Sequence, residues 1–360
     1  MLEHLWKLIL RRGRYSPLNV PAFFLWIASY LYRAGARLKM LLSGSPVKVG
    51  VPVISVGNVT VGGSGKTPLV GLLAREFLKR GVRVGVVSSG YGRTLRKPVL
   101  ASGRELQSRR AVETGDEVLL LASSVPDAVF SVDRSKTVAA RRLAESGRVD
   151  LIVVDDGFQH RKLWRDIDII AFDVSLDERL LHPFPYGVLR EPLSSLGRAQ
   201  AIVLTRTDLD YGISSVRDLL CRYSPGAEVI DSTFNITELV ATDGRYPTKL
   251  LQVRSAFLFA GIASFESLLR QVKPMVRKLD FALELADHQR YNRALLHRIK
   301  GMADRFGSEC ILTTGKDWVK MGHFDFGRES YYLEVEVELQ PSVEQFINRL
   351  AQILKVKQGE

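Results

Sequence analysis

The sequence predicts an α/β protein in which a mostly parallel sheet is flanked by helices. The first observation is that short, continuously apolar runs alternate with helical segments from residue 51 onward, a pattern typical of parallel strands covered on both faces. The second is a glycine-rich segment, residues 57–68, which lies between the apolar run 51–56 and a predicted helix. We therefore expect a P-loop NTPase-like fold, with ligands at the carboxyl ends of its strands.

Three regions are expected along the 360 residues. Residues 1–45 should form an N-terminal membrane-anchor helix, residues 46–250 the P-loop core, and residues 251–360 a smaller C-terminal α/β domain that closes over the active-site cleft. The expected strands are 51–56, 82–87, 128–132, 151–154, 167–172, 201–204, 256–260, 311–314 and 331–339. The expected helices begin after the glycine-rich segment and after Ser264, and also cover 116–123, 134–146 and 342–355.

The glycine-rich segment has the composition of a phosphate-binding loop. Gly62, Gly63 and Gly65 let backbone N–H groups close around phosphate oxygens without Cβ clashes. Lys66 can reach the outer phosphates, and the Thr67 hydroxyl can ligate Mg²⁺. We expect nucleotide contacts from Thr60, Val61, Gly62, Gly63, Ser64, Gly65, Lys66 and Thr67. An ordinary glycine-rich turn is the alternative, and the motif alone does not separate a kinase from an ATPase or a GTPase.

Two acidic pairs follow the loop in the sequence. Asp155 and Asp156 end the apolar run 151–154, which is the Walker B arrangement for holding Mg²⁺ or its water. Asp116 and Glu117 begin a predicted helix. At that position an acidic pair can simply complement the helix dipole, or it can supply a general base and a metal ligand.

Three weaker signals come from polar positions in predicted loops. Gln159 and His160 continue the Walker B segment and would line the cleft, and Arg190 stands in a proline-rich loop. Asp287 and His288 lie in the C-terminal region. Spacing alone gives none of these residues a role, because surface turns and solvated histidines have the same appearance.

Charge and apolar patterning point to an anionic partner. The net charge is +12 and the pI about 9.7, which favours nucleic acid, an acidic membrane or a phosphorylated substrate. The 18 residues between Arg14 and Arg33 carry no charge and are rich in aromatics; as a helix they would extend about 27 Å, barely enough to cross a bilayer. They suit a helix that lies in the membrane interface, or alternatively one that packs on the protein's own core. Two distant cysteines, Cys221 and Cys310, form no disulfide framework, which is typical of a reducing compartment.

Taken together, the sequence resembles the tetraacyldisaccharide 4′-kinase family, the lipid A 4′-kinases of Gram-negative bacteria. The matching segments run in family order over nearly the whole chain. They are 57–68, 89–93, 115–117, 154–160, 189–192, 259–262, 287–288 and 312–317. Thr60 is the family's own variant of the loop start, and Ser89 stands where the family pattern has arginine.

The resemblance implies a reaction and a set of residues. ATP would phosphorylate the 4′-hydroxyl of a tetraacylated disaccharide 1-phosphate at the cytoplasmic face of the inner membrane, with the protein peripheral or monotopic there. Asp116 would be the base, paired with His288, and Lys66 would act on the phosphates. Mg²⁺ would be held by Thr67, Glu117, Asp155 and Asp156. The substrate-binding residues would be Tyr91, Arg93, Gln159, His160 and Arg190. The implied partners are the lipid substrate and anionic membrane lipids, and not nucleic acid.

Two other classes of protein remain as alternatives. One is a membrane-associated P-loop ATPase or GTPase switch, because Thr205-Arg-Thr-Asp208 is weakly similar to a guanine-reading motif. The other is a nucleic-acid-binding ATPase, which only the net charge suggests. Phosphate transfer to a lipid sugar would distinguish the kinase from both.

Overall fold

The computed structural model describes residues 20–41, 44–94, 97–208, 212–241, 255–262, 264–287, 289–322 and 324–358. The chain divides into two compact units, each built from separated segments. Unit 1 comprises residues 1–66, 151–232 and 340–360, and unit 2 comprises residues 67–150 and 233–339. The domain limits expected at residues 45 and 250 stay a prediction, because residues 42–43 and 242–254 lie outside the described ranges.

The sheet of unit 1 has the strand order β8-β7-β6-β1-β5, and its pairs β5–β1, β1–β6, β6–β7 and β7–β8 are parallel. Its strands are β1 (Val53–Gly57), β5 (Leu151–Asp155), β6 (Ile167–Asp173), β7 (Ala201–Thr205) and the first part of β8 (Glu228–Ala241). All residues of β1, β5, β6 and β7 are buried, as their mostly apolar sequences predict. These parallel pairs confirm the predicted fold class.

The helices of unit 1 that follow β5 are η1 (Glu178–Leu180), η2 (Leu193–Arg198), α8 (Ile213–Tyr223) and α12 (Val343–Gln358). Of these, η2 and α8 contribute buried residues to the apolar cluster that includes the sheet. Val216 and Leu220 of α8 pack against Phe172 and Leu204 of the sheet. On the described part of α12, Phe346, Ile347, Leu350 and Leu354 are buried.

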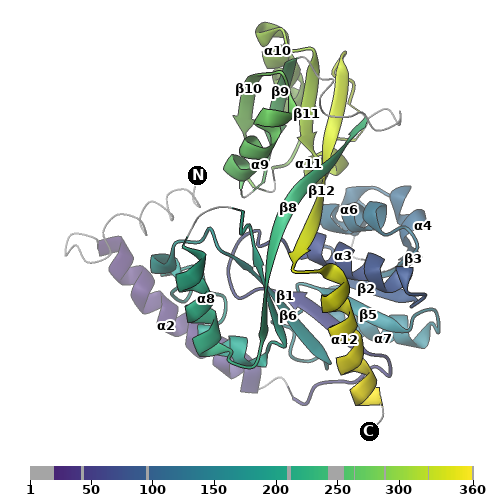
Figure 1. Ribbon diagram of the computed structural model, residues 1–360, viewed down its shortest axis with the longest axis vertical. Helices are drawn as coiled ribbons and strands as arrows, with labels where there is room; N and C mark the ends of the chain where they lie inside the picture. Colours follow the sequence, from purple (N-terminus) through teal and green to yellow (C-terminus); the bar gives the residue numbers. More distant parts are fainter. Residues whose placement is uncertain are drawn as a thin grey trace. The chain divides into compact units, whose positions relative to one another are not determined.

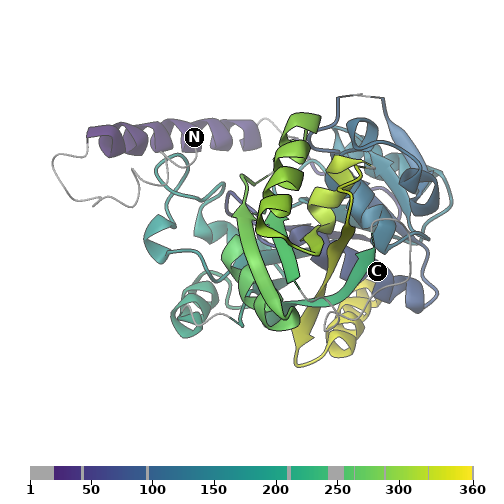
Figure 2. The same cartoon turned by 90° about the horizontal axis from the view of Figure 1, so that it is seen from above.

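Helix α2 (Val20–Leu41) also belongs to unit 1 and extends past Arg33 and Arg37. Figure 2 shows it as one straight rod. The Tyr32 ring lies 5.6 Å from that of Phe184, and the Tyr32 hydroxyl donates to the Arg190 carbonyl at 3.5 Å. Several large apolar side chains of α2 are nevertheless exposed: Phe23, Phe24, Trp26, Ile27, Tyr30, Leu31, Tyr32 and Leu38. Among the described helices, none combines the length and apolarity that crossing a bilayer requires.

The first part of unit 2 follows the phosphate loop. Helix α3 (Lys66–Lys79) buries Leu69, Leu72, Leu73 and Phe77 along one side. The strand order is β2-β4-β3, with β2 and β4 parallel and β3 antiparallel to β4. The elements are β2 (Val84–Ser88), β3 (Val99–Ser102), α4 (Gly103–Gln107), α5 (Ala111–Thr114), α6 (Asp116–Ser124), β4 (Val129–Val132) and α7 (Lys136–Glu145).

The second part of unit 2 contains the strands labelled in the upper part of Figure 1, in the order β10-β9-β11-β12-β8. Its strands besides β8 are β9 (Ser255–Ala260), β10 (Lys278–Glu284), β11 (Cys310–Thr314) and β12 (Glu329–Gln340). Its helices are α9 (Phe265–Val272), η4 (Lys273–Met275), α10 (Arg293–Phe306) and α11 (Gly315–Met321).

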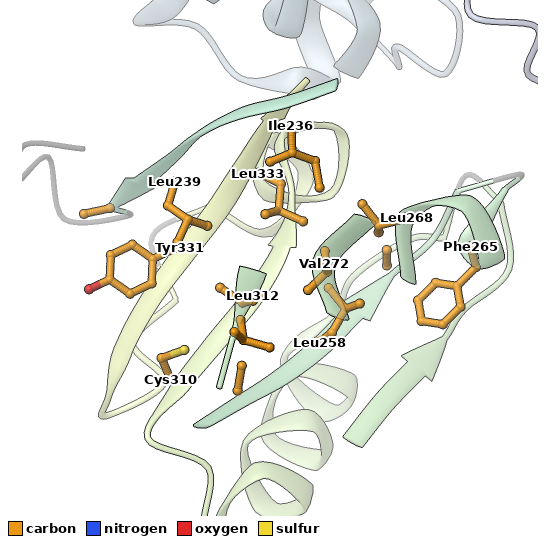
Figure 3. Packing of buried hydrophobic residues seen from close by; sticks show 14 residues of the cluster. Ile236, Leu239, Leu258, Phe265, Leu268, Val272, Cys310, Leu312, Tyr331 and Leu333 are labelled. Carbon is orange, nitrogen blue, oxygen red and sulfur yellow. The ribbon is translucent and has the colours of Figure 1, made fainter. Parts of the chain in front are cut away.

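Alternation along β9 places a helix on each face of this sheet. Leu258 packs with Leu268 and Val272 of α9, and Figure 3 shows this cluster with Leu312, Leu333 and Ile236 from neighbouring strands. Phe257 and Phe259 belong instead to the cluster that contains Leu296 and Ile299 of α10. Successive side chains of a strand point to opposite faces, so the apolar residues 256–260 of β9 require cover on both faces.

Candidate nucleotide and phosphotransfer site

The phosphate loop joins β1 to α3, as predicted. Gly62 and Gly65 adopt φ values of +114° and +78°, which L side chains adopt only with strain. One side of the loop is fixed by a neighbouring segment: the Val61 amide donates to the Val188 carbonyl at 2.7 Å, and the Arg190 amide to the Val59 carbonyl at 2.8 Å. The loop is therefore held in one shape by its backbone.

Two buried polar side chains at the phosphate loop lack a hydrogen-bond partner among the described residues. Ser64 Oγ, within the loop, has no hydrogen-bond partner among the described residues, and the Asn58 amide at the end of β1 has none either. Both residues are at most 1% exposed. Such orphaned groups are rare in folded proteins and are expected where a polar ligand binds, so this loop fits a nucleotide phosphate.

Cations and carboxylates meet at the start of α3. Lys66 Nζ lies 3.6 Å from Asp156 Oδ1, and Arg190 Nη1 lies 3.4 Å from Asp156 Oδ2. Asp155, the preceding residue, is buried at the end of β5, and Asp156 adopts a φ of +51°. Three of the predicted site residues, Lys66, Asp156 and Arg190, are thus brought together in unit 1.

The end of β7 also contacts the loop, which the sequence did not predict. The Thr205 hydroxyl lies 3.3 Å from the Ser64 carbonyl, and Arg206 Nη2 donates to the Gly63 carbonyl at 3.1 Å. Arg206 also forms a buried ion pair with Asp173 at the end of β6. The segment Thr205-Arg-Thr-Asp208, first considered as a base-reading motif, here contacts the phosphate loop.

In unit 2, glycines fix the position of Asp116. Gly115 has a φ of +96°, and a Cβ there would lie 3.1 Å from Gly90 Cα. Gly90 in turn has no room for a Cβ, which would lie 2.7 Å from the Thr114 carbonyl. The segment that contains Gly90 therefore packs directly on the turn before α6. Lys320 Nζ, from α11, lies 3.6 Å from Asp116 Oδ2.

The remaining predicted residues are placed as follows. Thr67 and Glu117 are half-buried, Tyr91 and His160 are exposed, and Arg93 Nη1 donates to the Lys97 carbonyl at 3.0 Å. Gln159 Nε2 donates to the Asn58 carbonyl at 2.6 Å. His288 lies outside the described residues, and its neighbour Asp287 accepts a hydrogen bond from Lys316 at 2.8 Å.

The donor set suits Mg²⁺ bound together with phosphate. Within the described ranges, no three His, Cys, Asp or Glu side chains form a preformed metal cage. P-loop enzymes do not require one, because Mg²⁺ takes a hydroxyl, one or two carboxylates, waters and phosphate oxygens. Thr67 in unit 2 and the Asp155/Asp156 pair in unit 1 each offer hard oxygen donors of that kind.

A parallel sheet, a phosphate loop between strand and helix, and an aspartate pair at the end of the adjacent strand define a P-loop nucleotide-binding protein. The model of the tetraacyldisaccharide-1-P 4′-kinase family matches residues 21–354. The chain therefore belongs to this family of kinases.

Relatives of known name agree with this membership. The chain is 34% identical over 302 residues to the tetraacyldisaccharide 4′-kinase of Geobacter metallireducens, covering 82% of this chain and 87% of that protein. It is 32% identical over 329 residues to the one from Anaeromyxobacter sp. (strain K), covering 89% and 86%. The crystal structure of LpxK from Aquifex aeolicus in complex with ATP superimposes with a TM-score of 0.72 at 26% identity, covering 93% of this chain and 100% of that one.

Proposed function

We propose that this protein transfers the γ-phosphate of ATP to the 4′-hydroxyl of tetraacyldisaccharide 1-phosphate in lipid A biosynthesis. The observation that carries the proposal is the pairing of Lys66 with Asp156 at the phosphate loop, in a chain that the kinase family model matches over residues 21–354.

The phosphate loop binds ATP in this proposal. Backbone amides of residues 60–67 hold the phosphates, and Lys66 neutralises the charge that shifts during transfer. Thr67, Glu117, Asp155 and Asp156 would hold Mg²⁺, which would supply positive charge to the phosphates. The orphaned Ser64 hydroxyl gives the loop a further donor for a phosphate oxygen.

Asp116 is the proposed general base. A carboxylate that accepts the proton of the 4′-hydroxyl makes that oxygen nucleophilic. The close packing around Gly115 fixes the backbone from which the Asp116 side chain extends. His288 would orient it. The basic and polar residues Arg93, Arg190, Gln159, His160 and Tyr91 are assigned to the anionic disaccharide.

The acceptor is a lipid, so the protein must meet a membrane surface. Helix α2 carries exposed Phe23, Phe24 and Leu31 together with Arg33 and Arg37. An exposed apolar stripe with basic residues favours binding in the interface of an anionic bilayer. We assign α2 as a peripheral or monotopic anchor at the cytoplasmic face of the inner membrane, and we assign no role to nucleic acid.

A transfer assay with γ-labelled ATP and tetraacyldisaccharide 1-phosphate in mixed micelles tests the proposal. We expect labelled lipid, and ADP release that depends on the lipid acceptor. The variant Lys66→Met serves as the inactive control. ADP release that is equal with and without the lipid, and that yields no labelled lipid, would support the membrane-associated switch instead.

A further inference from the structure

Two segments of the C-terminal half, residues 259–262 and 312–317, have no role in the reaction as described so far. In the structure they meet at Asp317, whose side chain is completely buried. Its Oδ2 atom accepts hydrogen bonds from the Gly261 amide at 2.9 Å and from the Thr314 hydroxyl at 2.7 Å. The Asp317 carboxylate is therefore fixed from two sides.

The approach of these segments depends on a glycine. A Cβ at Gly261 would lie 2.8 Å from the Ala286 carbonyl and 3.2 Å from Asp317 Oδ1. Any side chain there would force the backbone away from the carboxylate and break the amide contact. The two segments thus act together to hold one buried acid.

Lys320 stands one turn after Asp317 on α11. Its Nζ atom lies 3.6 Å from Asp317 Oδ1 and 3.6 Å from Asp116 Oδ2. The Lys320 and Asp116 side chains are 10% and 14% exposed. Helix α11 packs closely on α6, since a Cβ at Gly315 would lie 3.2 Å from Leu120 Cδ1. One ammonium group therefore lies between a fixed carboxylate and the carboxylate assigned as the base.

We propose that Lys320 is the positioning residue of Asp116, and that residues 259–262 and 312–317 hold Lys320 in place through Asp317. This inference rests on the proposed function, in which Asp116 accepts the proton. A base acts only from within hydrogen-bond reach of its hydroxyl, and small displacements of a reacting group cost large factors in rate. By restraining one oxygen of Asp116, the Lys320 ammonium group fixes the position of the carboxylate.

The variants Lys320→Met and Lys320→Arg test this proposal. Methionine keeps most of the side-chain volume and removes the charge, whereas arginine keeps the charge. We expect Lys320→Met to lower kcat by about 10- to 100-fold, the usual cost of losing a group that orients a site residue. KM for ATP and for the lipid should change by no more than about twofold, and Lys320→Arg should recover part of the lost kcat because it keeps a cation beside both carboxylates.

A matched control separates positioning from stability. Arg328→Met removes another partly buried cation of unit 2, whose ion pair is with Asp304. Both methionine variants should lower the melting temperature, because each removes a largely buried cation that pairs with a carboxylate. Only Lys320→Met should lower kcat. Equal, near-wild-type kcat in both variants would overturn the proposal, as would a raised lipid KM at unchanged kcat, which would make Lys320 a substrate contact.

Two further variants keep the test decisive. If Lys320→Met does not fold, Asp317→Asn releases Lys320 while keeping the volume of the acid, and the same loss of kcat is expected. The double variant Asp116→Asn/Lys320→Met should be no slower than Asp116→Asn alone, because both changes act on one group. A normal kcat in Asp116→Asn contradicts the assigned base itself, whereas a low kcat there together with a normal kcat in Lys320→Met contradicts only the role of Lys320.

Discussion

Lys66 and Asp156 lie face to face in unit 1, with Nζ and Oδ1 3.6 Å apart, and Arg190 approaches the other oxygen of the same carboxylate at 3.4 Å. The lysine comes from the phosphate loop and the aspartate from the end of the neighbouring strand β5. Asp156 thus pairs with two cations beside the phosphate loop, and in the proposed function these cations would face the phosphates of ATP.

The first prediction concerns Lys66. Lys66→Met should lower kcat by at least about 100-fold, because removing one charge that stabilises a transition state commonly costs that much. Labelled transfer from ATP to the lipid measures it. Lys79→Met, at the exposed end of the same helix, is the control and should keep wild-type turnover. Wild-type turnover in Lys66→Met would contradict the assignment of residues 60–67 as the phosphate-binding loop.

The second prediction concerns Arg206, which contacts the loop at Gly63 and pairs with Asp173. Lysine cannot make both contacts, because it lacks the guanidinium fork. Arg206→Lys should weaken ATP binding by about tenfold, the equivalent of one charged hydrogen bond, as measured by calorimetry. Arg165→Lys is the matched control, since Arg165 pairs with Asp168 at the other end of β6 and should lose stability but not ATP affinity. Equal losses of ATP affinity in both variants would show that Arg206 has no specific role in holding the phosphate loop.

The third prediction concerns the base. Asp116→Asn should lower kcat by at least about 100-fold with little change in ATP binding, because an amide fills the same volume but cannot accept the proton. His288→Ala should cost less, since its assigned role is to orient the carboxylate. The two losses should not add if the residues act as a unit. Strictly additive losses would show that they act independently.

The fourth prediction concerns the membrane. Phe24 and Leu31 of α2 are 64% and 72% exposed, and burying each in a bilayer interface is worth about 1.5–3 kcal/mol. Phe24→Ser/Leu31→Ser should therefore reduce co-sedimentation with anionic vesicles by at least tenfold. Val112→Ser, an exposed apolar residue of unit 2, is the control. Unchanged sedimentation of the double variant would place the membrane contact elsewhere.

The fifth prediction concerns pH. Burial, with Glu238 nearby, raises the pKa of Glu334 above its ordinary value of 4.5. The folded protein therefore binds this proton more tightly than the unfolded chain does, so the ionised Glu334 lowers stability near neutral pH. Glu334→Gln should be more stable than the wild type at about pH 8, and the difference should vanish below about pH 3.5, where the carboxyl is mostly protonated in both states. Chemical denaturation at both pH values measures it; a constant difference would contradict the raised pKa.

Elements with continuous apolar runs could be predicted from the sequence. Strands β5, β6 and β7 were expected within a residue or two of their ends, because all of their residues are buried. Strand β10 was not expected, since it lies at an edge of the sheet and its residues are only partly buried. Strand β8 was not expected either, because polar residues interrupt its 14 positions.

The candidate site residues also fall into two groups, those that the sequence indicates and those that only the fold brings together. The phosphate loop and the Asp155/Asp156 pair are local motifs, so spacing alone was enough to propose their residues. The proposed roles of three other residues depend on contacts with residues about 30 to 200 positions away in the sequence, which no spacing reveals. These residues are Arg206, Asp173 and Lys320. The signal at residues 312–317 was visible as part of the family pattern, but only the fold connects it to Asp116.

The most direct test of the central claim is where the phosphate goes. Tetraacyldisaccharide 1-phosphate and its 4′-deoxy analogue would be offered separately with labelled ATP, and the product would be located by phosphorus–proton correlation in NMR. We predict one new phosphate on the 4′-oxygen of the natural acceptor and no transfer to the deoxy analogue. Transfer to the deoxy analogue at a comparable rate, or a phosphate on any other oxygen, would contradict the assignment.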